Sequence, residues 1–173
     1  GPHEIPIWVA ARGERLLELA GRKADGIVVM AKADVGDALR MAGGERKNFS
    51  RMYLDRFAFT PEMIEEAREH YAYALMDSPP RLLHNLGVDD AAIERMHNAL
   101  AQGGPTAVGP FVTDEMIAAY QIAGTPDECG RQLRALIGQH RLDGFFINII
   151  SAGLEANTNL LRQVASIAAE SEG

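Results

Sequence analysis

Short apolar runs alternate with amphipathic stretches at the start of the chain. Residues 5–10, Ile-Pro-Ile-Trp-Val-Ala, are almost wholly apolar and rich in β-formers, as expected for a strand covered on both faces. Residues 13–23 place apolar and charged positions on opposite sides of a helix. Asp25-Gly26 ends this helix, and residues 27–30 form a second apolar run. This order predicts a βα unit with parallel strands.

The same order returns near the other end of the chain. Thr125-Pro126-Asp127-Glu128 has the composition of a capping box with proline at the first helical position, and it predicts a helix through His140. Asp143-Gly144 follows, and residues 145–150 form another buried strand. We interpret the two Asp-Gly pairs as two turns of one βα architecture. The alternative is chance recurrence of a common turn dipeptide.

The chain between these units is mainly helical in pattern. Helices are predicted to begin at Thr60, at Asp89 or Asp90, at Thr113 and at about Leu154. Residues 53–59 form a weaker strand candidate because Asp55 and Arg56 interrupt the apolar run, and residues 105–110 are expected to form a loop. We expect a single α/β domain over residues 1–173, with residues 43–104 as its mainly helical middle segment.

Composition and charge narrow the function classes. The 173 residues are 47% hydrophobic and 24% charged, as in ordinary globular domains. The net charge is −7 with no basic stripe, which argues against a nucleic-acid partner. Cys129 is the single cysteine, and no apolar run approaches the roughly 20 residues of a membrane span. No signal peptide is recognisable, so we expect a cytoplasmic protein without a membrane partner.

The turn between the first strand and its helix is a candidate anion site. Ala10, Ala11, Arg12 and Gly13 lie at the carboxyl edge of the predicted sheet, where parallel α/β folds build their sites. Small residues let a phosphate approach the free N–H groups of the helix, and an arginine adds charge. A plain tight turn is the alternative, and no G-x-G-x-x-G sequence is present.

The neighbouring strand ends supply further candidates. Met30 and Lys32 follow the second strand on the same edge, although the usual exposure of lysine favours a solvated loop residue at Lys32 over a ligand contact. Asn148, Ser151 and Gly153 follow the last strand, and Asn148 either bonds within the core or points into a pocket.

The remaining titratable residues predict no metal site and no catalytic acid, base or nucleophile. Glu94 and His97 have the spacing of one half of a di-metal motif, and we interpret them as a solvated helix face. Cys129 lies in the first turn of its helix, where the dipole lowers a thiol pKa, but its apolar stripe favours a buried, inert thiol. Tyr71, Tyr73 and Trp8 are interpreted as core or rim aromatics.

Two segments resemble the luciferase-like superfamily of flavin and deazaflavin oxidoreductases. The first combines Ala10-Ala11-Arg12-Gly13, Leu19-Ala20-Gly21 and Ala24-Asp25-Gly26 in one run. The second, residues 112–133, contains Ile122-Ala123-Gly124-Thr125-Pro126 followed by Cys129. It is similar to the branch of methylenetetrahydromethanopterin reductase, which uses the deazaflavin coenzyme F-420. The two segments lie at opposite ends of the chain, in the order that the family shows.

The resemblance implies a fold, a cofactor and a site. The family fold is a TIM barrel, so this chain would be a partial (β/α)8 barrel, the C-terminal half. The implied activity is hydride transfer between F-420, or alternatively FMN, and an organic substrate, as in a reductase or monooxygenase. Ala10, Ala11, Arg12 and Gly13 would lie beside the cofactor phosphate, with Met30 and Lys32 in the neighbouring loop.

The length of the chain is short for such a barrel, which typically needs about 250 residues. A half-barrel leaves strand edges unpaired, so we expect a homo-oligomer or an N-terminal half-barrel partner. Two alternatives stay open. The chain is a non-catalytic remnant that serves as an oligomerisation or binding module, or it is a different phosphate-ligand α/β enzyme with a similar turn.

Overall fold

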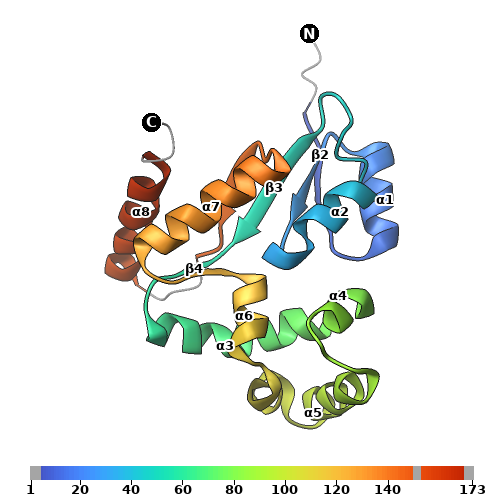
Figure 1. Ribbon diagram of the computed structural model, residues 1–173, viewed down its shortest axis with the longest axis vertical. Helices are drawn as coiled ribbons and strands as arrows, with labels where there is room; N and C mark the ends of the chain where they lie inside the picture. The colour runs from blue at the N-terminus through green and yellow to red at the C-terminus, as the bar shows by residue number, and fades with distance from the viewer. Residues whose placement is uncertain (1–4, 150–152, 170–173) are drawn as a thin grey trace.

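The computed structural model describes residues 5–149 and 153–169, and a parallel sheet lies at its centre. The strand order is β1 (Trp8–Ala10), β2 (Gly26–Val29), β3 (Ser50–Asp55) and β6 (Gly144–Ile147), and each neighbouring pair is parallel (Figure 1). After Arg56, the chain of β3 continues as β4 (Phe57–Ala58), which pairs in parallel with β5 (Ile122–Ala123). The predicted α/β class with parallel strands is therefore confirmed.

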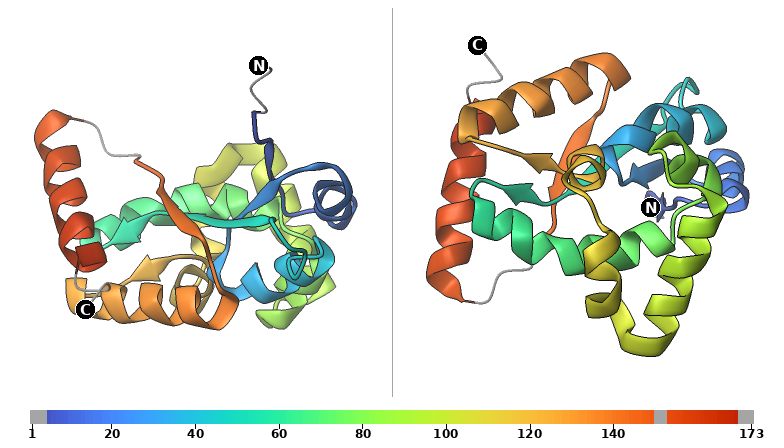
Figure 2. Two further views of the ribbon diagram at one scale, coloured as in Figure 1. Left: turned by 90° about the horizontal axis from the view of Figure 1, so that it is seen from above. Right: turned by 60° about the horizontal axis from the view of Figure 1, so that its bottom comes forward.

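Helices cover one face of the four-stranded sheet. These are α1 (Glu14–Lys23), α2 (Val35–Met41) and α7 (Pro126–His140), and α8 (Leu154–Ala169) packs beside α7 (Figures 1 and 2). The strand register turns alternate residues toward these helices, among them the fully buried Ile27 and Tyr53. The predicted capping box of α7 is present, because Thr125 and Glu128 each accept a hydrogen bond from the other's backbone.

A helical segment lies beyond the carboxyl ends of β2 and β3 (Figure 1). It contains α3 (Pro61–Met76), α4 (Pro80–Asn85), α5 (Asp90–Val108) and α6 (Asp114–Tyr120), and the 3-10 turn η2 (Gly109–Phe111) joins α5 to α6. A second 3-10 turn, η1 (Lys32–Asp34), lies between β2 and α2. This segment has its own apolar cluster, which includes Leu75, Leu83, Met96 and Ile117. Ala31, which follows β2, belongs to that cluster and joins the helical segment to the sheet.

The opposite face of the sheet is open. Trp8 on β1 is 41% exposed and Phe146 on β6 is 37% exposed, although their rings lie 5.9 Å apart. In the part of the chain that the structure describes, β1 and β6 each pair with one neighbour only, so the barrel is not closed. The helices of the same part contain no stretch long and apolar enough to cross a membrane.

The two Asp-Gly pairs have the same structural role. Asp25 and Ile7 exchange two hydrogen bonds of 2.8 Å, one of them from the Ile7 N–H to the Asp25 carboxylate. Asp143 and Arg51 repeat this exchange at the start of β3, again at 2.8 Å. Each aspartate therefore bonds a backbone N–H and a backbone carbonyl at the start of the neighbouring strand. The interpretation of two related βα turns is favoured over chance recurrence.

Several element predictions need correction. The first strand begins at Trp8 rather than Ile5, and the weak strand at 53–59 begins earlier, at Ser50. Residues 105–108, expected in a loop, are helical, because Gly104 breaks α5 with a φ of 71° and Pro105 starts a new helical stretch. The pattern analysis did not predict α2, α4 or β5, which are short.

Candidate functional site

A cavity of about 240 Å³ opens at the carboxyl edge of the sheet. The ends of all four strands of the sheet contribute to its wall, and α3 and α6 complete it. The residues at its wall are Arg12 after β1, Met30 and Ala31 after β2, Leu54, Asp55 and Arg56 on the chain of β3, Asn148 after β6, and His70, Tyr71, Tyr73, Ala74 and Tyr120 from the helical segment. Parallel α/β folds bind their ligands at this edge.

The predicted anion turn lies at the rim of the same edge. Ala10 ends β1 and is exposed, and Ala11 is buried and donates its N–H to the Val28 carbonyl. Gly13 is the N-cap of α1, and no side chain caps this helix. The first helical bonds run from Leu16 and Leu17 to the Gly13 carbonyl, so the earlier N–H groups of the first turn have no partner among the described residues and are available to a ligand.

Arg12 points from this turn into the cavity wall. Its guanidinium donates to the Ala74 carbonyl at 2.7 Å and to Asp77 at 2.5 Å, both at the end of α3. Its side chain is only 16% exposed, whereas Asp77 is 67% exposed. Arg12 thus links the end of α3 to the β1 turn through hydrogen bonds, and it places a positive charge at the wall of the cavity.

Met30 and Lys32 do not face the same space. Met30 lies at the cavity wall beside Arg12, but the Lys32 ammonium donates to Gln132 on α7 at 2.7 Å and lines a different cavity. The residue between them, Ala31, has a φ of 68°, an unusual conformation that turns the chain at this point. Burial lowers the pKa of Lys32, with opposing effects from Asp55 and Cys129. The structure thus brings together Ala10 to Gly13 and Met30, and it places the Lys32 side chain elsewhere.

Asp55 forms the floor of the cavity and is 5% exposed. Its carboxylate accepts hydrogen bonds from the hydroxyls of Tyr53 (2.6 Å) and Tyr71 (2.8 Å). It also accepts from the backbone N–H groups of Arg56 (2.6 Å) and Ile122 (2.8 Å). One carboxylate therefore connects β3, α3 and β5 at the base of the cavity.

The protonation of Asp55 reflects a competition between burial and these bonds. Burial raises the pKa of Asp55 to about 6, and the four donated hydrogen bonds limit the rise because they favour the charged form. Burial likewise raises the pKa of Tyr71 well above its usual range, with Asp55 adding to the effect. Tyr71 therefore stays protonated and acts as a hydrogen-bond donor.

The other predicted residues lie in various places. Asn148 is half-buried at the cavity wall, which confirms the pocket alternative for it. Ser151 lies outside the described residues, and Gly153 directly precedes α8. Glu94 and His97 are exposed on α5, as expected.

Cys129 is fully buried, which confirms the prediction of a buried thiol. Burial raises its pKa to about 12, and the nearby Glu128 charge adds to the rise. The helix dipole does not make this thiol reactive, because the apolar surroundings disfavour a thiolate.

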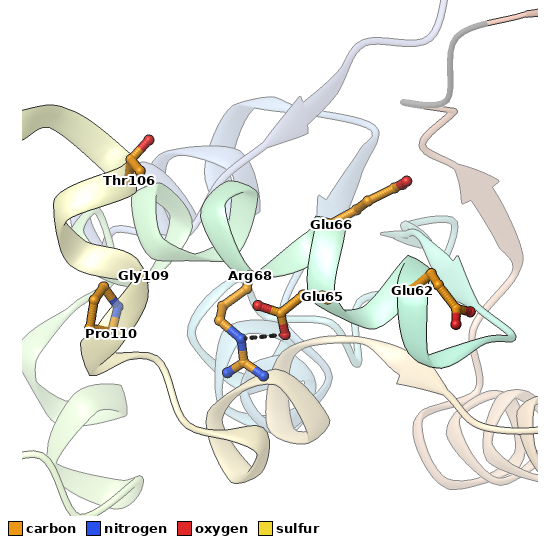
Figure 3. Close-up of a pocket in the computed structure, with 7 residues that line it drawn as sticks. All are labelled: Glu62, Glu65, Glu66, Arg68, Thr106, Gly109 and Pro110. Atoms are coloured by element: carbon orange, nitrogen blue, oxygen red, sulfur yellow. Dashed lines mark hydrogen bonds and ion pairs between the residues drawn. The ribbon is translucent and has the colours of Figure 1, made fainter.

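A wider cavity of about 800 Å³ lies between α3 and the α5–η2 turn and contains none of the predicted site residues (Figure 3). Figure 3 shows Glu65 facing Arg68, whereas Glu66 points away from them. Within residues 5–149 and 153–169, no cluster of three or more histidine, cysteine, aspartate or glutamate side chains is placed to hold a metal ion.

Sequence reasoning did not single out Asp55, Arg56 and His70 as site residues. In the sequence, Asp55 and Arg56 are apparent only as polar residues that interrupt an apolar strand. That interruption was itself a usable signal, because charged residues at the carboxyl end of a buried parallel strand commonly point into a site. His70 lies on a helix face that carries no distinguishing pattern.

The chain matches the family model described as luciferase-like monooxygenase over residues 1–140. It is 31% identical over 147 residues to the 5,10-methylenetetrahydromethanopterin reductase of Methanolobus tindarius, covering 78% of this chain and 45% of that protein. It is 29% identical over 156 residues to the enzyme of that name from Archaeoglobus fulgidus, covering 78% of this chain and 46% of that protein. The chain therefore spans about half the length of these relatives.

Solved structures show the same fold. A coenzyme F420-dependent tetrahydromethanopterin reductase from Methanopyrus kandleri superposes with a TM-score of 0.73 at 24% identity, over 91% of this chain and 49% of that chain. An F420-dependent secondary alcohol dehydrogenase gives a TM-score of 0.59 at 13% identity, over 95% of this chain and 49% of that chain. With the open four-stranded sheet and the family match over most of its length, this chain belongs to the luciferase-like oxidoreductase family.

Proposed function

We propose that this chain is part of an F-420-dependent oxidoreductase and supplies the side of the site that holds the cofactor phosphate. The observation that carries the proposal is the meeting of the β1 and β2 turns at one sheet edge, with the uncapped first turn of α1 beside them. Both relatives are named as reductases, and both solved neighbours are named as F420-dependent enzymes, which favours F-420 over FMN.

The residues of the turn fit a phosphate group. A Cβ placed on Gly13 meets no atom within 4 Å, so there is open space beside the free N–H groups. Ala10 and Ala11 are too small to block that space. We assign the phosphate contacts to the backbone of residues 11–13 and to the first turn of α1, with Met30 against the adjoining part of the cofactor. Arg12 contributes positive charge at this edge rather than a direct bond, because its guanidinium is already bonded to Asp77. Lys32, which is bonded to Gln132 and lines a different cavity, is not assigned a phosphate contact.

The proposed reaction is hydride transfer between the bound deazaflavin and an organic substrate. The cofactor supplies the hydride carrier, and the protein supplies binding, orientation and electrostatics. In the described residues, the groups suited to those tasks are the turn around Gly13 and the buried network of Asp55. The single buried thiol, Cys129, is consistent with the reducing cytoplasm, where we place the protein.

Cofactor titration tests the proposal. F-420 and FMN are each added to this chain, and to any longer gene product that contains it, while absorbance and fluorescence are followed. Binding of F-420 in preference to FMN is the expected result. If neither preparation binds either cofactor, the proposal fails.

Gly13→Ala locates the phosphate within the site. Gly13 has a φ of −73°, and an added methyl group meets no protein atom, so the free energy of unfolding should change by less than about 0.5 kcal/mol. The methyl group nevertheless occupies the space proposed for the phosphate, and F-420 affinity should fall at least about tenfold. Gly138→Ala on α7 is the matched control, since its added Cβ also meets nothing within 4 Å. Equal F-420 affinity in both variants would contradict the assignment.

The open sheet face favours a second candidate function, that of an association module. Two copies of this four-stranded parallel sheet contain the eight strands of a closed barrel, and the chain covers 49% of the solved reductase. A twofold axis along the barrel would bring β1 of each copy beside β6 of the other, with both pairs parallel. This candidate predicts association without cofactor uptake.

A further inference from the structure

The cavity at the sheet edge is lined by a buried arginine whose positive charge is only weakly paired with acidic side chains. Arg56 is only 4% exposed, and within the described residues its side chain makes one ion pair, with Glu66 at 3.3 Å. That distance is at the long end for a charged hydrogen bond, and Glu66 is itself 68% exposed. A buried guanidinium normally has closely paired carboxylates or comparable acceptors. Arg56 therefore has donor capacity left at the wall of the cavity.

Two further groups add to this positive field. Arg12 lies at the same wall, and His70 completes that side of the cavity. Burial lowers the pKa of His70, and the charges of Arg56 and Arg12 at the same cavity wall lower it further. An anion between them would be attracted by both arginines and would allow the imidazole to accept a proton.

The acidic residue of the cavity does not neutralise this field fully. Both oxygens of Asp55 are already bonded to donors, two hydroxyls and two backbone N–H groups. The carboxylate is thus directed at the protein rather than at the cavity space. Its raised pKa also makes it partly neutral near pH 6.

We propose that this cavity binds an oxyanion group of the substrate, a carboxylate or a phosphate, with Arg56 as its main ligand and His70 and Asn148 as further contacts. A planar guanidinium matches the two oxygens of such a group. The volume of about 240 Å³ suits one head group rather than a whole cofactor. The assignment of this oxyanion to a substrate rests on the proposed function. The binding of an oxyanion rests only on the residues of the cavity.

The pKa of His70 reports occupancy without any need for catalytic activity. Histidine NMR signals are titrated against pH in this chain at constant ionic strength, with sodium chloride alone, with inorganic phosphate and with propionate, and the His70 signal is identified by its loss in His70→Gln. We expect phosphate or propionate to raise the pKa of His70 by about half a unit or more. An unchanged His70 titration in both would overturn the proposal.

Arg56→Gln and Arg56→Lys test the main ligand. Arg56→Gln removes the charge and should weaken oxyanion binding at least tenfold. Arg56→Lys keeps the charge, so it should preserve the folded structure and weaken oxyanion binding only a fewfold. Arg68→Gln is the control, because Arg68 pairs with Glu65 and Asp114 outside this cavity. Wild-type oxyanion binding in Arg56→Gln would overturn the assignment.

F-420 titration separates the two sources of an oxyanion. If the cavity serves the substrate, Arg56→Gln loses phosphate and propionate binding at the His70 signal but keeps the F-420 affinity of the wild type. If Arg56→Gln loses F-420 affinity as strongly as it loses the small anion, the cavity holds the cofactor phosphate and the substrate assignment is wrong. If the wild type does not bind F-420, only the proposed function is contradicted, because the response of His70 to the small anions can still be measured.

Discussion

The carboxylate of Asp55 shows how a single residue can be misjudged from sequence. Within the apolar run at 53–59 it weakened the strand prediction, because a charged side chain in a buried strand has no local partner. Its actual partners come from Tyr71 on α3 and from the backbone of Ile122. These contacts lie across the fold, so they could not be inferred from the residues around Asp55. The anion turn, by contrast, was predictable because its features are contiguous in sequence.

Asp55 makes stability depend on pH. Its folded pKa of about 6 lies above the value of 3.8 for a free aspartate, so the folded state binds the proton more tightly than the unfolded state. The stabilisation is fully present below pH 3.8 and is lost as pH rises through 6. Integration of this difference between pH 4 and pH 7.5 gives a loss of about 2 kcal/mol from this group.

Urea unfolding of the wild type and Asp55→Asn across this pH range tests the effect. We expect the stability of the wild type relative to the variant to fall by about 2 kcal/mol from pH 4 to pH 7.5. Asp127→Asn removes the same formal charge from an exposed position that forms no ion pair within the described residues, and serves as the control. Parallel curves for wild type and Asp55→Asn would show that Asp55 is not the titrating group.

At the scale of elements, the repeated Asp-Gly turns explain why βα units were the most predictable part of the chain. Each aspartate accepts a hydrogen bond from a backbone N–H at the start of the neighbouring strand, Ile7 just before β1 and Arg51 within β3, so the sequence of the turn also fixes where the strands pair. At the start of β3, the Arg51 guanidinium also donates a hydrogen bond to the Asp143 carboxylate, at 3.3 Å. The short elements α2, α4 and β5 carry no comparable local signal, and they form because tertiary contacts order them.

The two turn glycines should differ in their tolerance of a side chain. A Cβ on Gly26 would lie 2.7 Å from the backbone oxygen of Ser50 and equally close to the ring of Trp8. A Cβ on Gly144 meets the terminal methyl of Met52, which can move. We therefore expect Gly26→Ala to cost about 1–3 kcal/mol of unfolding free energy and Gly144→Ala less than about 1 kcal/mol. Chemical denaturation measures both; the reverse order would refute this account of the turns.

At the scale of the whole molecule, the open sheet face agrees with the expectation that a chain this short for a TIM barrel leaves strand edges unpaired. The chain spans about half the length of its relatives, and within the described residues the sheet ends at β1 and β6, each of which pairs with one neighbour. Trp8 and Phe146 lie on the uncovered face, whereas the register buries the alternate residues under α1, α2 and α7. Exposed apolar side chains also lie elsewhere, among them Leu16, Tyr73 and Leu154, but the rings of Trp8 and Phe146 contact each other on the uncovered face, and we therefore expect this face to form an interface.

Association through this face is the prediction that belongs to the whole molecule. Light scattering over a range of concentrations should give a mass that rises from one copy toward two, since a dimer forms by mass action. Phe146→Lys places a charge in the proposed interface and should keep the chain monomeric with an unchanged far-ultraviolet circular dichroism spectrum. Leu154→Lys is the matched control, because Leu154 is 85% exposed at the start of α8 and lies outside this face. A wild-type mass of one copy at every concentration, or the same masses for wild type and Phe146→Lys, would mean that a second copy does not cover the sheet.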